Sequence, residues 1–292
     1  MAIKLAFIGV IIIWSTTPLA INWSNGDMGF LFGVTTRMIL ACVVSGFLVT
    51  ILCHHFSLSA RSLKAYFVSG VGIYIAMLMA YWSASYMPSG WIALVWGVSP
   101  VIAGIFGHMF LGENTLVRHK LLGTFAGLLG LVIIFFEGTS LGNNTSLGVL
   151  LALVGVLGQL GSAVAVKKLD ANVTGLVMTT GGLAVSIPLF SLTWWIFDGQ
   201  LPEVIPFKAG ASIVYLALMG SVIGFSLYYY LLKNVEASKV SLITLVTPVS
   251  ALLLGSTLNN EVIGLSVIIG TVLILAGLAS YQWGEKWFSR NA

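Results

Sequence analysis

The amino-acid sequence predicts an all-α integral membrane protein in which ten transmembrane helices form two inverted five-helix repeats. Three observations predict this fold class: an apolar composition, ten apolar stretches of spanning length, and residues that recur at a fixed separation. Hydrophobic residues make up 58% of the 292 residues and charged residues only 8%, whereas a soluble protein carries about 25% charged residues. So few charges cannot cover a water-facing surface, which excludes a soluble enzyme, a nucleic-acid-binding protein and a disordered chain.

A transmembrane helix needs about 20 mostly apolar residues, and charged residues, glycines, prolines and asparagines separate ten such stretches. In chain order they cover residues 3–23, 29–52, 63–86, 89–111, 120–136, 147–166, 173–196, 209–232, 237–258 and 264–283. The loops between them are short, so we expect no soluble domain. The first stretch lacks a small-residue cleavage site, so we expect no cleavable signal. Cys42 and Cys53 follow no spacing pattern and predict neither a disulfide nor a metal site.

The lysines and arginines predict the orientation of the spans. If the N-terminus is cytoplasmic, 11 of the 13 basic residues lie on the cytoplasmic side, Lys208 alone lies outside, and Arg37 lies within a span. Cytoplasmic loops of membrane proteins are enriched in lysine and arginine. We therefore expect an even number of spans with both termini in the cytoplasm. The 11 residues are Lys4, Arg61, Lys64, Arg118, Lys120, Lys167, Lys168, Lys233, Lys239, Lys286 and Arg290.

Several residues recur 148 positions apart, which indicates an internal repeat. Pro100 pairs in this way with Pro248, and Glu113 pairs with Glu261. Because five spans separate the members of each pair, the second copy enters the membrane in the opposite orientation. We expect the two copies at residues 1–138 and 139–292. Further pairs at this separation are Tyr81 with Tyr229, Trp82 with Tyr230 and Ser99 with Thr247; with one residue deleted, Gly123 and Gly130 match Gly270 and Gly277.

A set of short motifs follows the same order as in a known family. The set consists of Trp14-Ser15, Arg37 four residues before Ala41, Tyr81-Trp82, Pro88-Ser89-Gly90, Ser99-Pro100 and Leu111-Gly112-Glu113, with Ala237-Ser238, Thr247-Pro248 and Glu261 in the second copy. It resembles the EamA-type transporters of the drug/metabolite transporter superfamily. The resemblance implies ten helices in two inverted repeats, a central substrate cavity, and mostly export of small metabolites. Two features differ from the family pattern: Asn259-Asn260-Glu261 stands where a second Leu-Gly-Glu is expected, and Trp91 and Trp96 stand where smaller residues are usual. The resemblance therefore does not identify the substrate.

The two paired prolines mark candidate gating or hinge positions. Pro100 and Pro248 each lie 11 residues into a span. A proline inside a helix frees the carbonyl four residues earlier, here that of Trp96 and that of Thr244. A freed carbonyl is costly in lipid unless it faces protein or a water-filled cavity. The prediction is a pair of kinked, cavity-facing helices, and the alternative is a kink that serves packing alone.

Polar and aromatic residues deep in the spans are the candidates for substrate binding. A buried indole or phenol favours a hydrogen-bond partner, which a polar cavity supplies. Gln159 is the amide at mid-span, and its alternative role is to join two closely packed helices. The candidates are Trp14, Tyr74, Tyr81, Trp96, Ser99, Gln159, Tyr228, Tyr229 and Thr244.

The charged residues within or near the spans have different expected roles. Arg37 lies inside a span, where a charge is a functional hypothesis by default, although anchoring of the helix is the favoured alternative. His108 lies near the cytoplasmic boundary and is the other candidate for a charge role. Glu113 and Glu261 lie at span ends, where we expect them to accept amide hydrogens at the start of the next helix.

The interpretation is a secondary transporter of small organic metabolites, such as amino acids or related compounds, which alternates access at a central cavity. Export is implied by the resemblance, as is a place in the bacterial inner (plasma) membrane. We expect no enzymatic activity, catalytic residue, cofactor, metal or nucleic-acid partner, and the expected partners are the substrate and the lipid bilayer. Alternatives are an uptake carrier for nucleoside-like or aromatic compounds and a non-transporting scaffold. The sequence does not distinguish a monomer from a homodimer.

Overall fold

Helices form the regular structure throughout the described part of the chain. The computed structural model describes residues 2–26, 28–52, 55–113, 118–141, 144–245 and 247–288, and within these ranges there is no strand. Cys53 and Arg290, which entered the predictions above, lie outside them. By length and composition, seven helical segments of the described ranges can cross a membrane: Ala2–Asn25, Phe30–Ile51, Ala60–Ser83, Ser89–Leu111, Thr145–Leu169, Gly175–Phe197 and Phe207–Asn234.

The ten predicted stretches are all helical, and three of them are interrupted. The continuous helices are α1 (Ala2–Asn25), α2 (Phe30–Ile51), α3 (Ala60–Ser83), α6 (Arg118–Leu141), α7 (Thr145–Leu169), α8 (Gly175–Phe197) and α13 (Leu265–Phe288). The fourth stretch divides into α4 (Ser89–Trp96) and α5 (Ser99–Leu111). The eighth contains α9 (Phe207–Tyr215), the π-helix η1 (Leu216–Ile223) and α10 (Gly224–Asn234). The ninth contains α11 (Ala237–Val240), the 3₁₀-helix η2 (Ser241–Leu245) and α12 (Thr247–Asn259).

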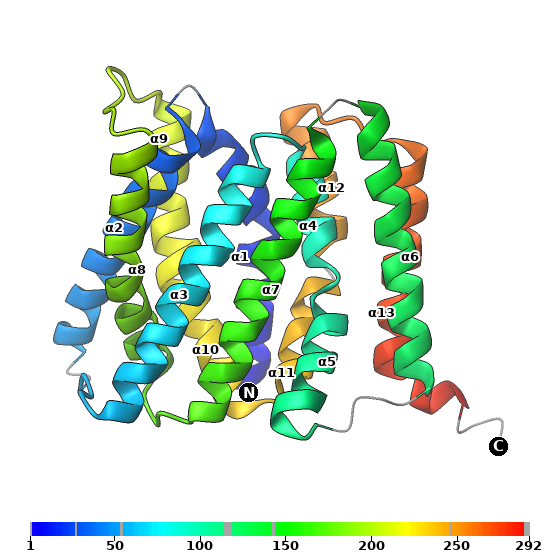
Figure 1. Ribbon diagram of the computed structural model, residues 1–292, viewed down its shortest axis with the longest axis horizontal. Helices are drawn as coiled ribbons and strands as arrows, with labels where there is room; N and C mark the ends of the chain where they lie inside the picture. Colours follow the sequence, from blue (N-terminus) through cyan, green and yellow to red (C-terminus); the bar gives the residue numbers. More distant parts are fainter. Residues whose placement is uncertain are drawn as a thin grey trace.

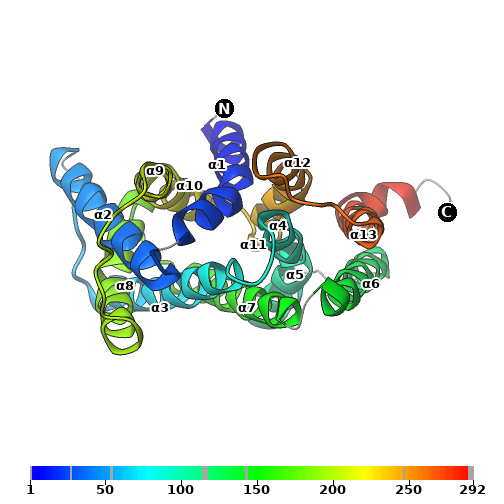
Figure 2. The same cartoon turned by 90° about the horizontal axis from the view of Figure 1, so that it is seen from above.

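The helices run side by side (Figure 1) and form an elongated bundle of two rows when seen from above (Figure 2). Seen from above, α1, α4, α5 and α11 occupy the middle, α2, α8 and α9 one edge, and the paired α6 and α13 the other (Figure 2). Helix α1 begins and α13 ends at the same end of the bundle. This agrees with the prediction of an even number of crossings.

The outer faces of the helices carry large apolar side chains. Ile12 of α1 is 61% exposed, Val43 of α2 is 65% exposed and Phe67 of α3 is 61% exposed. Large exposed apolar surfaces of this kind mark contact with a partner or a membrane. A lipid bilayer can surround these helices because their backbone hydrogen bonds are made within each helix.

Each paired proline begins a helix instead of kinking one. Helix α4 ends at Trp96, and Pro100 lies in the first turn of α5, where its missing N–H costs nothing. The freed Trp96 carbonyl accepts a hydrogen bond of 2.6 Å from the Ser99 hydroxyl. Pro248 likewise lies in the first turn of α12, after η2. The predicted kinks are therefore corrected to helix breaks, since the proline and the Ser99 hydroxyl together favour a new helix start.

Glycines allow α6 and α13 to pack with their backbones in contact. A Cβ atom on Gly123 would collide with the Gly277 carbonyl, and one on Gly277 would collide with the Gly123 carbonyl. A Cβ atom on Gly130 would lie 2.5 Å from the Gly270 carbonyl oxygen. Small residues at such contacts are the usual means of close helix association in membranes. The four glycines of the repeat therefore meet crosswise at this helix pair, Gly123 with Gly277 and Gly130 with Gly270.

Candidate functional site

A cavity of about 70 Å³ lies in the middle of the bundle, enclosed by segments from both halves of the chain. A second cavity of about 20 Å³ shares four lining residues with it: Trp14, Trp96, Gln159 and Thr244. The 70 Å³ space, called the central cavity below, is lined by Trp14, Thr17, Pro18, Ile21, Arg37, Met77, Ala80, Ile92, Ala93, Trp96, Gln159, Gly220, Phe225, Thr244 and Thr247.

Six of the nine predicted substrate-binding residues come together at these two cavities. Trp14, Trp96, Gln159 and Thr244 line both, and Ser99 and Tyr228 line the smaller one. The rings of Trp14 and Tyr228 lie 5.2 Å apart, and the Gln159 side chain interacts with the Tyr228 hydroxyl. Trp96 and Thr244 stand 148 positions apart in sequence, one at the break after α4 and the other in η2. The helix breaks thus bring equivalent positions of the two halves to one space.

Tyr81 lies behind the cavity wall and does not line it. Its side chain is 0% exposed, and its ring centroid is 5.7 Å from the Arg37 guanidinium carbon. Its hydroxyl is buried without a hydrogen-bond partner. Met77 and Ala80, on the adjacent face of α3, line the cavity in its place.

Tyr74 and Tyr229 also lie away from the central cavity. The Tyr74 hydroxyl is 2.7 Å from the Thr193 Oγ1, and its ring meets Phe190 edge-on, so it joins α3 to α8. Ser69 donates a 2.7 Å hydrogen bond to the Tyr229 hydroxyl, which again joins α3 to the second half of the chain. Both residues therefore form hydrogen bonds between helices.

The remaining predicted positions lie around the cavity or at the bundle end. Pro100 does not line it, and the Pro248 ring packs close to Gly97, in the break between α4 and α5. His108 is exposed, with its Nδ1 3.1 Å from the Glu113 carbonyl oxygen. Within the described ranges there is no cluster of three or more His, Cys, Asp or Glu side chains suited to a metal.

Several lining residues were missed although their spacing pointed to them. Thr17, Pro18 and Ile21 follow Trp14 by three, four and seven positions, which places all four on one face of α1. Ile92 precedes Trp96 by four positions in the same way on α4. Helical periodicity from each predicted tryptophan would have found them.

Arg37 forms one wall of the central cavity and is 1% exposed. Its Nε donates a 3.0 Å hydrogen bond to the Ser221 hydroxyl of η1. Its guanidinium lies against Gly220, where an added Cβ would be 3.0 Å from Nη2. Its Nη1 is buried without a hydrogen-bond partner. The structure therefore attaches one edge of the guanidinium to η1 and leaves a donor free.

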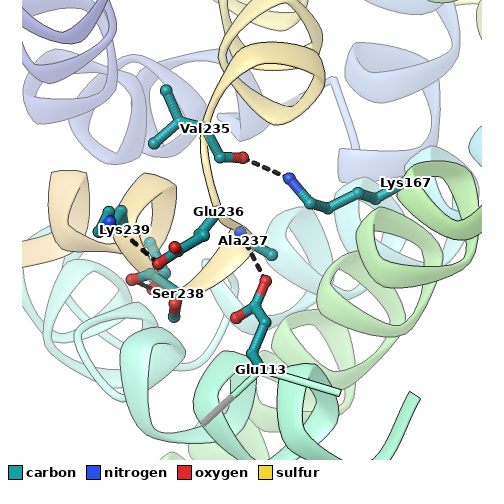
Figure 3. A network of polar contacts seen from close by, with 8 residues as sticks. Glu113, Lys167, Val235, Glu236, Ala237, Ser238 and Lys239 are labelled. Carbon is teal, nitrogen blue, oxygen red and sulfur yellow. Dashed lines mark hydrogen bonds and ion pairs between the residues drawn. The ribbon is translucent and has the colours of Figure 1, made fainter. Parts of the chain in front are cut away.

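Glu113 and Glu261 each contact the start of a helix in the opposite half of the chain. Glu113, just after α5, accepts a 3.3 Å hydrogen bond from the Ala237 amide at the start of α11 (Figure 3). Glu261, just after α12, accepts hydrogen bonds from the Ser89 amide (3.1 Å), the Ser89 hydroxyl (2.7 Å) and the Gly90 amide (3.2 Å) at the start of α4. Among the described residues each carboxylate thus contacts a helix of the opposite half, where the sequence predicted the next helix along the chain.

The backbone around the two carboxylates is the same in both halves. Gly112 and Asn260, which precede them, have φ values of +67° and +52°. Asparagine tolerates this left-handed conformation better than most residues, so Asn259-Asn260-Glu261 keeps the geometry of Leu111-Gly112-Glu113. An added Cβ on Gly107 would lie 2.5 Å from Glu113 Oε2, and one on Gly255 would collide with Glu261 Oε2. Both glycines therefore leave room for the carboxylate beside its helix.

Lys167 adds a further contact at the end of the bundle where α1 begins. Its ammonium donates a hydrogen bond of 3.0 Å to the carbonyl of Leu232 and another to the carbonyl of Val235 (Figure 3). Glu236 and Lys239 form a surface ion pair of 3.1 Å beside it. These groups hold the turn between α10 and α11, next to the Glu113 contact.

Comparison with known proteins agrees with the membrane architecture. The model of the EamA-like transporter family matches residues 1–136 and again residues 146–281. The chain is 24% identical to the uncharacterized transporter YoaV of Bacillus subtilis (strain 168), across 94% of this chain and 95% of the relative. It is 28% identical to the uncharacterized inner membrane transporter YedA of Escherichia coli (strain K12), across 68% and 65% respectively. A solved crystal structure shares the fold, with a TM-score of 0.72, 19% identity, and coverage of 98% of this chain and 99% of that chain.

Proposed function

The chain belongs to the EamA-like transporter family, and on this premise we propose that it exports small organic metabolites, such as amino acids, by alternating access at the central cavity. The relatives are named as transporters, which supports transport as the activity of this chain. The observation that carries the proposal is the central cavity itself. Both halves of the chain line it, with indole, amide, hydroxyl and guanidinium groups in otherwise apolar walls.

The size of the cavity supports a change in its shape during transport. Ligand pockets usually measure about 300–1,000 Å³, and the central cavity measures about 70 Å³. A metabolite can therefore occupy it only if the surrounding helices separate. Segments that are broken near the cavity, α4–α5 and η2–α12, are the natural places for this movement, and Pro100 and Pro248 begin the helices that follow the breaks. We assign the hinge role to these two prolines.

An inverted relation between residues 1–138 and 139–292 is part of the proposal. Three findings support it. The family model matches the chain twice, and Glu113 and Glu261 make reciprocal contacts. In addition, corresponding helices of the two halves pack on corresponding partners. Helix α3 packs on α7 and α8, as the α9–η1–α10 segment packs on α1 and α2. Helices α6 and α13 pack on each other through matching glycines. Five spans in each half would produce these pairings.

Liposomes that contain the purified protein test transport and its energy source together. None of the nine acidic residues lies in the middle of an expected span, and proton-driven carriers usually have one there. We therefore expect at least one member of a panel of radiolabelled L-amino acids to be transported. Its net flux should stop when its concentrations inside and outside the liposomes are equal. Sustained accumulation under a pH gradient, abolished by a protonophore, would contradict facilitated transport and make His108 the first residue to replace. Absence of flux for amino acids, nucleosides and aromatic compounds alike would favour a scaffold.

Reporter fusions test the proposed orientation. With 11 of 13 basic residues assigned to the cytoplasmic side, a reporter after Arg290 should be cytoplasmic, and one between residues 140 and 144 should be periplasmic. The measurement is paired alkaline phosphatase and fluorescent protein activity at each site. A periplasmic C-terminus would refute the proposed orientation.

A further inference from the structure

Arg37 is a buried cation, and among the residues that the structure describes it has no anionic partner. Its side chain is 1% exposed, and it lies seven residues after the start of α2 at Phe30, inside a helix that can span the membrane. Within the described ranges, the ion pair present joins Lys239 to Glu236, far from Arg37 in the chain. A buried charge that lacks a counter-ion is costly. The arrangement around Arg37 therefore needs an explanation.

The contacts of Arg37 orient its guanidinium without neutralising it. The Ser221 hydroxyl accepts from Nε at 3.0 Å, and the Tyr81 ring lies 5.7 Å away, close enough for a cation–π interaction. Gly220 allows the guanidinium to approach the backbone of η1. π-Helical segments such as η1 are frequent at functional sites. These neighbours hold one edge of the planar group, while Nη1 remains an unused donor in a residue that lines the central cavity.

We propose that Arg37 binds the carboxylate of the transported solute in the central cavity. A guanidinium favours carboxylates because its donors match their two oxygens. Among the described lining residues Arg37 alone is cationic, so a single negative charge fits better than a phosphate dianion. Apolar walls from Met77, Ile92 and Phe225 suit a hydrocarbon or aromatic body attached to that carboxylate. That the bound solute is also transported rests on the proposed function. Binding of a carboxylate can be measured without transport.

A matched pair of ligands tests the binding step. Benzoate and benzamide share shape and differ in charge, and sodium chloride at equal ionic strength controls for anions in general. Benzoate should raise the melting temperature of the purified wild-type protein, because a ligand that binds only the folded state stabilises it. Arg37→Gln should increase the half-saturating concentration of benzoate about tenfold or more. Arg61→Gln, which changes an exposed arginine at the start of α3, should bind benzoate like the wild type.

The stability of the variants separates binding from anchoring. Because no described carboxylate pairs with Arg37, Arg37→Gln should melt within a few degrees of the wild type. If Arg37→Gln unfolds while Arg37→Lys remains folded, the arginine serves as an anchor and the proposal is overturned. Equal stabilisation of the wild type by benzoate, benzamide and chloride would also overturn it, as would unchanged benzoate binding by Arg37→Gln. Benzoate binding without flux in liposomes would refute the proposed function and leave the carboxylate site standing.

Discussion

Trp96→Ala should reduce solute flux in liposomes at least about tenfold while changing the melting temperature little, and Tyr81→Ala should mainly destabilise the fold. Trp96 is half-buried and lines both cavities at the break after α4. Removing its indole enlarges a space that already exists. Tyr81 is 0% exposed and supports the Arg37 guanidinium from behind. Removing a fully buried aromatic side chain costs about 3–5 kcal/mol.

Tyr81→Phe is the matched control for this pair. The Tyr81 hydroxyl is buried without a hydrogen-bond partner, so its removal should cost little or even stabilise the protein. The measurements are thermal unfolding in detergent and flux of the best-transported member of the amino-acid panel. Equal loss of flux and stability in Trp96→Ala would show that the tryptophan serves packing and would contradict its place in the binding site.

Glu261→Ala should lower both stability and flux, and it should do so more than Glu113→Ala. Glu261 accepts three hydrogen bonds from Ser89 and Gly90 and a fourth from Asn259, whereas from the described residues Glu113 accepts one, from Ala237. Hydrogen bonds to charged groups contribute about 1.5–3 kcal/mol each, and a carboxylate at a helix start also interacts favourably with the helix dipole. Because each contact joins the two halves near one end of the bundle, its loss should also disturb the closing of that end.

An exposed carboxylate provides the control for these two substitutions. Glu203 lies in the loop between α8 and α9 and is exposed, so Glu203→Ala should leave stability and flux unchanged. Glu261→Gln should fall between Glu261→Ala and the wild type, because an amide oxygen still accepts a hydrogen bond without the charge. A Glu261→Ala protein that melts and transports like Glu203→Ala would contradict the role of this contact.

The positions of the helices could be predicted from the sequence because they depend on local properties. The places where prolines disturb a helix could be predicted for the same reason, although as kinks and not as the breaks that the structure has. Apolar stretches mark spans wherever they occur, and proline restricts its own helix regardless of its neighbours. The repeat also identified Trp96 and Thr244 as equivalent positions, and both line the cavity. The left-handed conformation shared by Gly112 and Asn260 explains why an apparent departure from the family pattern leaves the backbone unchanged.

The direction in which a side chain points was harder to predict. In a soluble helix, the apolar face identifies the core, but every face of a membrane helix is apolar. Nothing in the sequence around Tyr81 distinguishes the packed face of α3 from the face with Met77 and Ala80. The partners of Glu113 and Glu261 were missed for another reason: they lie 124 and 172 positions away in the chain. Such contacts depend on the packing of the two halves, which no local pattern encodes.

Thiol labelling of Thr244→Cys tests most directly whether one cavity opens to both sides of the membrane. The variant is prepared with Cys42 and Cys53 replaced by Ala, and a charged, membrane-impermeant maleimide is added to either face of oriented vesicles. Val43→Cys, on the outer face of α2, is the control and should remain unlabelled. Alternating access predicts that Thr244→Cys is labelled from each side in turn. Labelling from neither side, or from one side alone, would contradict the account.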